Sequence, residues 1–256
     1  MRSLLWLLLS VFYLAIPLHA KQIAIVIDDV GNHQRDLNLL SLPGELTFAI
    51  LPHTPYSQKF AYLASQQSKE LLLHVPMQAI EDKALGPGAL TLDMDKQTLQ
   101  MTLGHALASL PQVSGVNNHM GSALTQYSDP MKWTMEVLRK RGLYFLDSRT
   151  TNESQAQTVA DLYGVANIAR QVFLDNEKQD TYFAQQLNEA KSIALRSGQS
   201  VLIAHPYPET VAFLHAQIPH LLKQGYELVP LSQLVRTRYI QLAKSTAAVV
   251  PSIAEK

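Results

Sequence analysis

The stretch Gln22–His33, QIAIVIDDVGNH, joins a buried type of segment to a charged one. Ile23–Ile27 is an unbroken apolar run, which is typical of a strand covered on both faces in a parallel sheet. Asp28 and Asp29 follow directly. Unpaired charge is expensive to bury, so the pair predicts a polar site at the end of this strand. The alternative is a helix cap next to a solvated loop charge.

The same pattern of a short apolar run and a longer segment with helical spacing repeats along the chain. The expected strands are Ile23–Ile27, Leu46–Leu51, Leu71–Val75, Val113–Asn117, Leu143–Leu146, Ile168–Leu174, Ser200–Ala204 and Glu227–Val229. The expected helices are Tyr56–Gln67, Asp95–Leu110, Pro130–Arg141, Asp180–Ser197 and Glu209–Lys223. This alternation predicts a single α/β domain with mostly parallel strands.

The composition narrows the classes of function. The chain has 256 residues, no net formal charge and no cysteine. Without a basic excess it lacks the charge that attracts nucleic acid. Without cysteine it has neither disulfides nor thiolate metal ligands. A metal site in this chain would therefore use histidine and carboxylate side chains.

The two ends of the chain differ from its middle. Residues 1–20 have a positive start, an apolar stretch and a small residue, Ala20, at a cleavage position, which predicts a signal peptide. We expect an exported, periplasmic protein with no stable membrane insertion after cleavage. The alternatives are a secreted protein and an uncleaved, membrane-tethered one. We assign residues 21–236 to the domain and 237–256 to a C-terminal tail, either a frayed extension or a weak helix.

Polar side chains follow the expected strands one after another. They are Asp28, Asp29, His74, Asn118, His119, Asp147, Arg149, Asp175 and His205. The carboxyl ends of parallel strands lie on one side of a sheet, and in a barrel they surround one mouth; in an open sheet they would meet at a switch point. Histidine and carboxylate groups in this place point to a divalent cation, zinc first, and to acid–base catalysis.

Six motifs in order, AIVIDDVG, LLLHVPM, GVNNHMGS, LYFLDSRT, ARQVFLD and IAHPYPET, give the chain a family resemblance. From about Lys21 to Val235 it resembles the divergent polysaccharide deacetylases, the YibQ-type exported proteins. These are distant relatives of the metal-dependent polysaccharide deacetylases that share the nodulation-type (NodB) homology domain. The resemblance implies a distorted (β/α)7-type barrel.

The resemblance also implies roles for individual residues. In the first motif Asp28 is the expected general base and Asp29 a metal ligand. His74 is the second ligand, but Gln78 stands where the family pattern has another histidine. We suggest that His119 supplies the missing ligand from another strand.

Further positions complete the expected site. His205 is the expected general acid, and Asp147 is expected to orient it, with Arg170 a weaker member of the same network. Asn118, Arg149 and Tyr207 are the expected substrate-binding residues.

The resulting expectation is a metal-dependent deacetylase that acts on N-acylated amino sugars of envelope polysaccharide or peptidoglycan. The alternative is a catalytically inactive barrel that binds glycan or a cell-wall enzyme through the same mouth.

Overall fold

A computed structural model describes residues 21–249 of the chain. The predicted signal peptide lies outside the described residues. Among the helices of residues 21–249, none is both long enough and apolar enough to cross a membrane.

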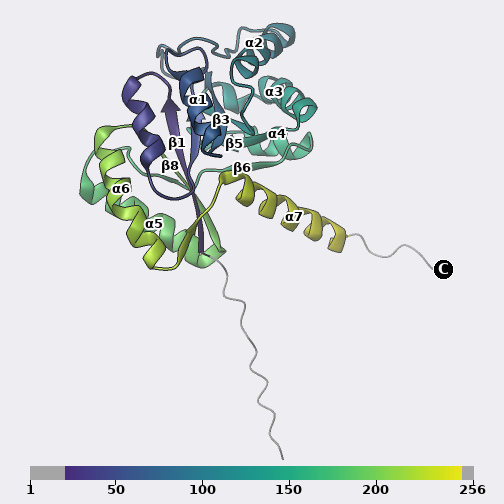
Figure 1. Ribbon diagram of the computed structural model, residues 1–256. Coiled ribbons are helices and arrows are strands. Elements are labelled where there is room, and N and C mark those ends of the chain that lie inside the picture. The colour runs from purple at the N-terminus through teal and green to yellow at the C-terminus, as the bar shows by residue number, and fades with distance from the viewer. Residues whose placement is uncertain (1–20, 250–256) are drawn as a thin grey trace, which may run out of the picture.

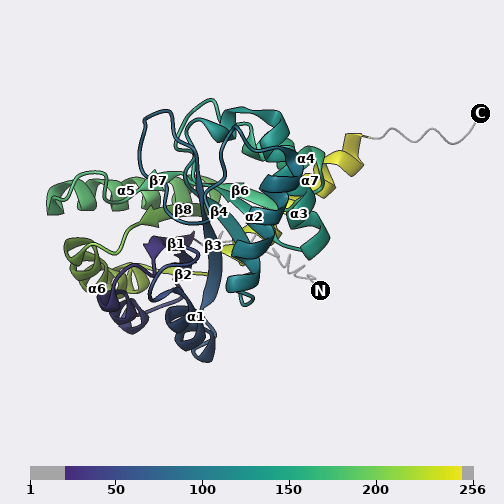
Figure 2. The ribbon, with the colours of Figure 1, turned by 90° about the horizontal axis from the view of Figure 1, so that it is seen from above.

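The strands form one curled, all-parallel sheet (Figures 1 and 2). They are β1 (Lys21–Val30), β2 (Thr47–Ile50), β3 (Glu70–Met77), β4 (Gly115–Met120), β5 (Tyr144–Asp147), β6 (Asn167–Ala169), β7 (Val172–Phe173), β8 (Gln199–Ala204) and β9 (Tyr226–Leu228). Their order is β6-β5-β4-β3-β2-β1-β8-β7, and β9 pairs with the start of β1. The expected α/β barrel of mostly parallel strands is confirmed.

The barrel closes through the segment Asn167–Phe173, where the sequence predicts the single strand Ile168–Leu174. Its first part pairs with β5 and its last part with β8. The two residues between them change sides: the Arg170 amide donates to the Asp147 carbonyl, and the Gln171 amide donates to the Val201 carbonyl. We call Asn167–Phe173 the seam of the barrel.

The helices surround the strands in an outer ring (Figure 2). They are η1 (Gln34–Ser41), α1 (Ser57–Gln66), α2 (Lys96–Ser109), η2 (Leu124–Gln126), α3 (Ser128–Arg141), α4 (Ala156–Leu162), α5 (Asp180–Ser197), α6 (Pro208–Lys223) and α7 (Leu231–Val249). The sequence prediction missed α4, the two 3-10 helices and the start of α7. Helix α7 runs from the predicted domain into the predicted tail and points away from the barrel (Figure 1).

Alternating residues of each strand face two different cores. In β1, Ile23, Ile25 and Ile27 pack in the larger core, which lies under the helices, whereas Ala24 and Val26 pack in the smaller core inside the barrel. The smaller core also contains Leu231, Leu234 and Val235 of α7, which close the base of the barrel. Period-two alternation therefore decides which polar side chains reach the inside of the mouth.

Candidate active site

A bulge at the end of β1 brings two adjacent carboxylates to the same site. The register of β1 against β2 shifts between Ile27 and Val30. Two residues of β1 there lie opposite one residue of β2, as in a β-bulge. Asp29 has a φ of 58°, a left-handed conformation that aspartate tolerates better than most residues. Alternation alone would turn Asp28 and Asp29 to opposite faces, and the bulge removes that restriction.

Asp29, His74 and His119 each offer a ligand atom, and these three atoms lie within 4.8 Å of one another. Asp29 Oδ1 is 3.2 Å from His74 Nε2 and 2.7 Å from His119 Nδ1. Within residues 21–249 this buried oxygen has no hydrogen-bond partner. A buried carboxylate oxygen that lies close to two imidazole nitrogens but forms no hydrogen bond of good geometry fits a divalent cation as the shared partner of all three groups. The three side chains expected to share an ion are therefore brought together.

The side chain of Asn117 fixes His74 in the orientation that a ligand needs. His74 is 2% exposed, and its Nδ1 lies 2.8 Å from Asn117 Oδ1. The amide oxygen is an acceptor, so Nδ1 of His74 carries a proton, and Nε2 is the nitrogen directed at Asp29. Metal-binding histidines are commonly held this way by a second hydrogen bond.

Asp28 is buried beside the three ligands and is held by the same asparagine. Asn117 Nδ2 donates to Asp28 Oδ1 at 2.9 Å, and Asp28 Oδ2 lies 3.7 Å from His74 Nε2. Burial raises the pKa of Asp28, and the charge of His74 offsets only part of that rise. A carboxylate with a raised pKa is a stronger base, which suits it to accept a proton.

The electrostatics of Asp29 are opposite to those of Asp28. Burial by itself would raise the pKa of Asp29, but contacts with His119 and His74 outweigh it and hold that pKa well below its usual range. For His74, burial opposes protonation, but the charges of Asp28 and Asp29 outweigh it and raise the pKa of the imidazole. The adjacent Asp28 and Asp29 are thus a proton acceptor and a permanent anion.

His205 lies after β8 and is held by Asp175, not by Asp147. Asp175 Oδ1 lies 2.8 Å from His205 Nδ1, and Asp175 Oδ2 accepts from the His205 backbone amide at 2.7 Å and from Thr210 Oγ1 at 2.8 Å. Burial opposes protonation of this ring, yet the bond to Asp175 and the charges of Asp175, Asp29 and Asp28 raise the pKa of His205 to about 9. A histidine with this pKa carries its proton at neutral pH.

The expectation that Asp147 orients His205 is therefore wrong. Asp147 accepts from the Arg149 amide at 2.8 Å and from Ser154 Oγ at 2.8 Å, and so it shapes the loop before α4. Its neighbours Leu146 and Ser148 have the inward parity of β5, whereas Asp147 shares the outward parity of Phe145. Arg170 belongs to this loop as well, because its Nε and Nη2 donate to the carbonyls of Ser148 and Arg149.

The three expected substrate-binding residues have different surroundings. Asn118 is 1% exposed, and its amide bonds to the Met120 carbonyl and the Ser148 amide, so its assignment to substrate is corrected. Arg149 is half-buried after β5, with a φ of 47°. The Tyr207 ring is half-buried, 5.7 Å from the His205 ring, and Lys178 lies over it.

Gln78 is not an alternative ligand. Its side-chain oxygen accepts from the Leu92 amide at 2.7 Å, which ties the end of β3 to the loop before α2. The departure from the family pattern at this position thus places a loop-forming residue there, and His119 occupies the space beside His74, with ring centroids 5.1 Å apart.

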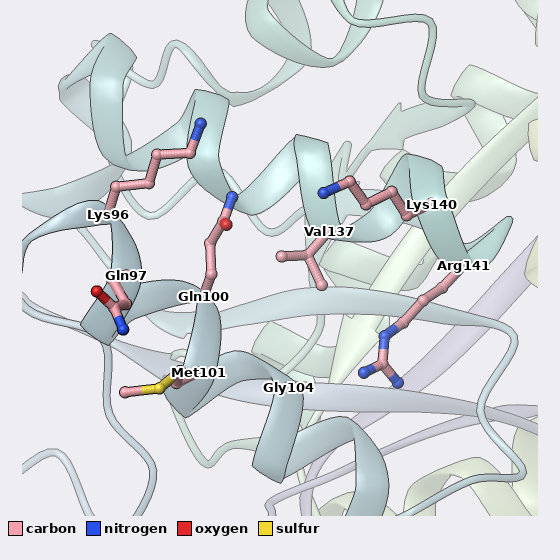
Figure 3. A pocket seen from close by; sticks show the side chains of 8 residues that line it. All are labelled: Lys96, Gln97, Gln100, Met101, Gly104, Val137, Lys140 and Arg141. Carbon is pink, nitrogen blue, oxygen red and sulfur yellow. The ribbon is translucent and has the colours of Figure 1, made fainter.

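A separate groove of about 550 Å³ lies on the outer wall between α2 and α3 (Figure 3). Lys96, Met101 and Arg141 are among the residues that line it, and none of the candidate ligands does. It is not part of the candidate site.

These features define a parallel α/β barrel with an Asp-His-His group and an aspartate-held histidine at its mouth. The chain belongs to the divergent polysaccharide deacetylase family, whose family model matches residues 25–235. This confirms the resemblance seen in the sequence.

A sequence relative supports this assignment, and two solved structures have a similar fold. The chain is 33% identical to the uncharacterized protein YibQ of Escherichia coli over 239 residues, 93% of this chain and 75% of that one. The fold is similar to that of the uncharacterized protein ATU2773 of Agrobacterium tumefaciens, with a TM-score of 0.81, 24% identity and coverage of 84% and 89%. It is also similar to the catalytic domain of peptidoglycan N-acetylglucosamine deacetylase from Eubacterium rectale, with a TM-score of 0.53, 14% identity and coverage of 82% and 88%.

Proposed function

We propose that this protein is an exported, metal-dependent deacetylase that hydrolyses the acylamino groups of amino sugars in envelope glycan. One observation carries the proposal. The buried Asp29 Oδ1 lies between two imidazole nitrogens without a hydrogen-bond partner in the described chain, and groups suited to accept and donate protons lie beside it.

Asp29, His74 and His119 would hold the cation, and zinc is our first choice because two imidazoles and a carboxylate are a common zinc ligand set. Such an ion, when bound, supplies a Lewis acid for the acyl carbonyl and lowers the pKa of water. Asn117 would keep His74 Nε2 directed at the ion through the bond to Nδ1.

Asp28 and His205 would divide the proton transfers of amide hydrolysis. Asp28 would accept the proton of the attacking water, because its raised pKa makes it the better base of the two aspartates. His205 would protonate the nitrogen of the leaving amine. Asp175 holds His205 Nδ1, which leaves Nε2 as the nitrogen able to donate. Water adds to the acyl carbon, the C–N bond breaks, and acetate and a free amino sugar result.

Three observations favour an envelope glycan as substrate. The neighbour from Eubacterium rectale acts on N-acetylglucosamine of peptidoglycan, by its name. The signal peptide predicted for residues 1–20 would bring this protein to the compartment where such polymers lie. The half-buried Tyr207 ring beside His205 offers an apolar face for a sugar ring.

The test combines metal analysis with acetate release. The purified protein should hold about one divalent ion per chain and release acetate from N-acetylated chitotetraose or peptidoglycan when the ion is present. The double variant His74→Ala, His119→Ala should lose both, whereas His105→Ala, an exposed histidine on α2, should retain both.

Two results would contradict the proposal in different ways. Full metal occupancy in the double variant would remove the ligand assignment. Saturable glycan binding without acetate release, with and without added zinc, would favour the non-catalytic barrel instead.

A further inference from the structure

The two strands of the seam are joined without a helix between them. Within residues 21–249, each strand from β2 to β5 is followed by a helix before the next strand of the sheet begins. Only Arg170 and Gln171 separate β6 from β7. Parallel sheets normally have helices over both faces, and where this connection lacks one, a hollow of about 640 Å³ lies against the seam.

Guanidinium and amide groups line this hollow, which we call the seam hollow. It includes Arg149, Arg170, Arg238, Asn152, Gln171 and Gln199. No carboxylate is among its lining residues in the described part of the chain. Its volume falls in the range of small-ligand sites, about 300–1,000 Å³.

Two of the three arginines form no direct ion pair in the described chain. Arg238 is paired with Asp161 at 3.1 Å. Arg149 and Arg170 form no ion pair within 4 Å with any residue between 21 and 249. Two guanidinium groups without a directly paired carboxylate, in a hollow with no acid in its lining, are complementary to an anion. The planar fork of arginine matches a carboxylate best.

Arg170 is held in place before any ligand arrives. Its Nε and Nη2 each donate at 2.7 Å to a backbone carbonyl, and its guanidinium lies 3.8 Å from the Phe173 ring centroid. A guanidinium has five N–H donors, so these two bonds leave donors free. A fixed side chain loses little conformational freedom on binding, which favours affinity.

A row of rings joins the seam hollow to the candidate active site. The Phe173 ring, which carries Arg170 on one side, lies 6.1 Å from the His205 ring, and His205 lies 5.7 Å from Tyr207. The Phe173 ring thus lies between Arg170, which lines the hollow, and the proposed general acid. A glycan with one sugar at His205 would place a neighbouring sugar near Arg170.

We infer that the seam hollow binds a carboxylate on a sugar next to the one at the active site, with Arg149 and Arg170 as its partners. The inference rests on the proposed function for its choice of a glycan. It specifies the substrate class further: an acidic amino-sugar polymer, such as one with lactyl ether carboxylates, in preference to a neutral one.

The test is a comparison of two ligands that differ in one functional group. The first is a peptide-free tetrasaccharide of alternating N-acetylglucosamine and N-acetylmuramic acid with free carboxylates. The second is the same tetrasaccharide with these carboxylates converted to carboxamides. Calorimetry on the metal-free protein, which avoids turnover, should give a Kd lower for the acid by about 10-fold or more, as expected for a charge-assisted hydrogen bond.

Two variants test whether the preference for the acidic ligand arises in the seam hollow. In Arg149→Gln the ratio of the two Kd values should fall to within about threefold of one, whereas Arg139→Gln, an exposed arginine at the end of α3, should keep the wild-type ratio. Equal Kd values in the wild type, or a preference that Arg149→Gln leaves intact, would overturn the inference.

The outcome is independent of catalysis. Acetate release from neutral chitotetraose with no acid preference would contradict only the seam hollow. Acid preference without any acetate release would contradict only the deacetylase.

Discussion

The mouth and the base of the barrel each contain a carboxylate on a strand, but the two are satisfied differently. Glu70, where β3 begins at the base, accepts from Thr47 Oγ1 at 2.8 Å, from Ser114 Oγ at 3.3 Å and from the backbone amide of Ser232 at 3.1 Å. Asp29, where β1 ends at the mouth, has one buried oxygen with no hydrogen-bond partner among residues 21–249.

The difference separates a group that this chain satisfies from one that the proposed cation would satisfy. Every donor on Glu70 comes from this chain, and the bond to Ser232 caps the first turn of α7, which closes the base. An unsatisfied buried acceptor costs stability, and Asp29 is one in a protein that satisfies Glu70 fully. Strain accompanies it: Asp29, Met120 and Arg149 all have positive φ at the mouth.

The largest expected effect comes from Asp29→Asn. The amide keeps the shape of the side chain but removes the negative charge that a cation needs. Zinc affinity should fall by more than the roughly 10–100-fold that the loss of a residue supporting a ligand costs. Competition with a chromogenic chelator measures it. An affinity within a few-fold of wild type would mean that the unsatisfied oxygen is not a ligand.

A smaller loss of metal affinity is expected for Asn117→Leu. This change removes the bonds to His74 Nδ1 and Asp28 Oδ1 but leaves all three ligands in place. Zinc affinity should fall about 10–100-fold, since the imidazole loses the partner that sets its orientation and tautomer. The same chelator competition applies, with Asn118→Leu as a test of position: it changes the adjacent asparagine, which bonds only to loop backbone. Equal losses in both variants would indicate a general packing effect.

A substitution at the base of the barrel should lower stability and leave zinc affinity nearly unchanged. Glu70→Gln removes the charge that accepts from Thr47, Ser114 and Ser232, so the free energy of unfolding should fall by about 1–3 kcal/mol. Zinc affinity should stay within about threefold of wild type, because Glu70 lies at the other end of the barrel. Urea unfolding of the metal-free protein tests the expected loss of stability, and the chelator competition tests the expected zinc affinity. A loss of zinc affinity here would show that base and mouth are coupled.

The strands and the site cluster were predictable because both follow from hydrophobic period and parallel topology. The expected strand Leu71–Val75 is part of β3, and His74 and His119 meet because they lie on adjacent parallel strands. The role of Asp29 came from the family resemblance. Helix α4 and the 3-10 helices were missed. Helix α4 is only seven residues long and has no side-chain cap, so its sequence carries few of the usual signals.

The correct surroundings of Asp147 and Asn118 could also have been predicted, because side chains alternate between the two faces of a strand. Counting from Leu146, which faces the barrel interior, Asp147 points outward; counting from Ile203, His205 points inward. The same count places Asp175 inward after Phe173 and Asn118 outward beside Asn117. The direction of the Asp29 side chain could not be predicted by this count. A bulge in β1 resets the alternation, and the position of the bulge depends on how β1 pairs with β2.

The smallest expected effect is a displaced titration in Asp175→Asn. The carboxylate of Asp175 accepts three hydrogen bonds, and its charge helps to raise the pKa of His205 to about 9. Without that charge the His205 pKa should move down toward the ordinary value of about 6.5. Nuclear magnetic resonance titration of the His205 ring in the metal-free protein measures the shift, and Asp147→Asn serves as the comparison, because Asp147 bonds to Arg149 and Ser154 instead.

The sign of the linked stability follows from the direction of the shift. A histidine whose folded pKa exceeds its unfolded value stabilises the protein fully below the unfolded pKa, and that contribution disappears as pH rises through the folded value. The wild type should therefore exceed Asp175→Asn in stability most at pH 6, and the difference should shrink between about pH 6.5 and 9. Deacetylation that needs a protonated His205 should decline near pH 9 in the wild type and at lower pH in the variant. Identical pH profiles would mean that Asp175, like Glu70, only stabilises the fold.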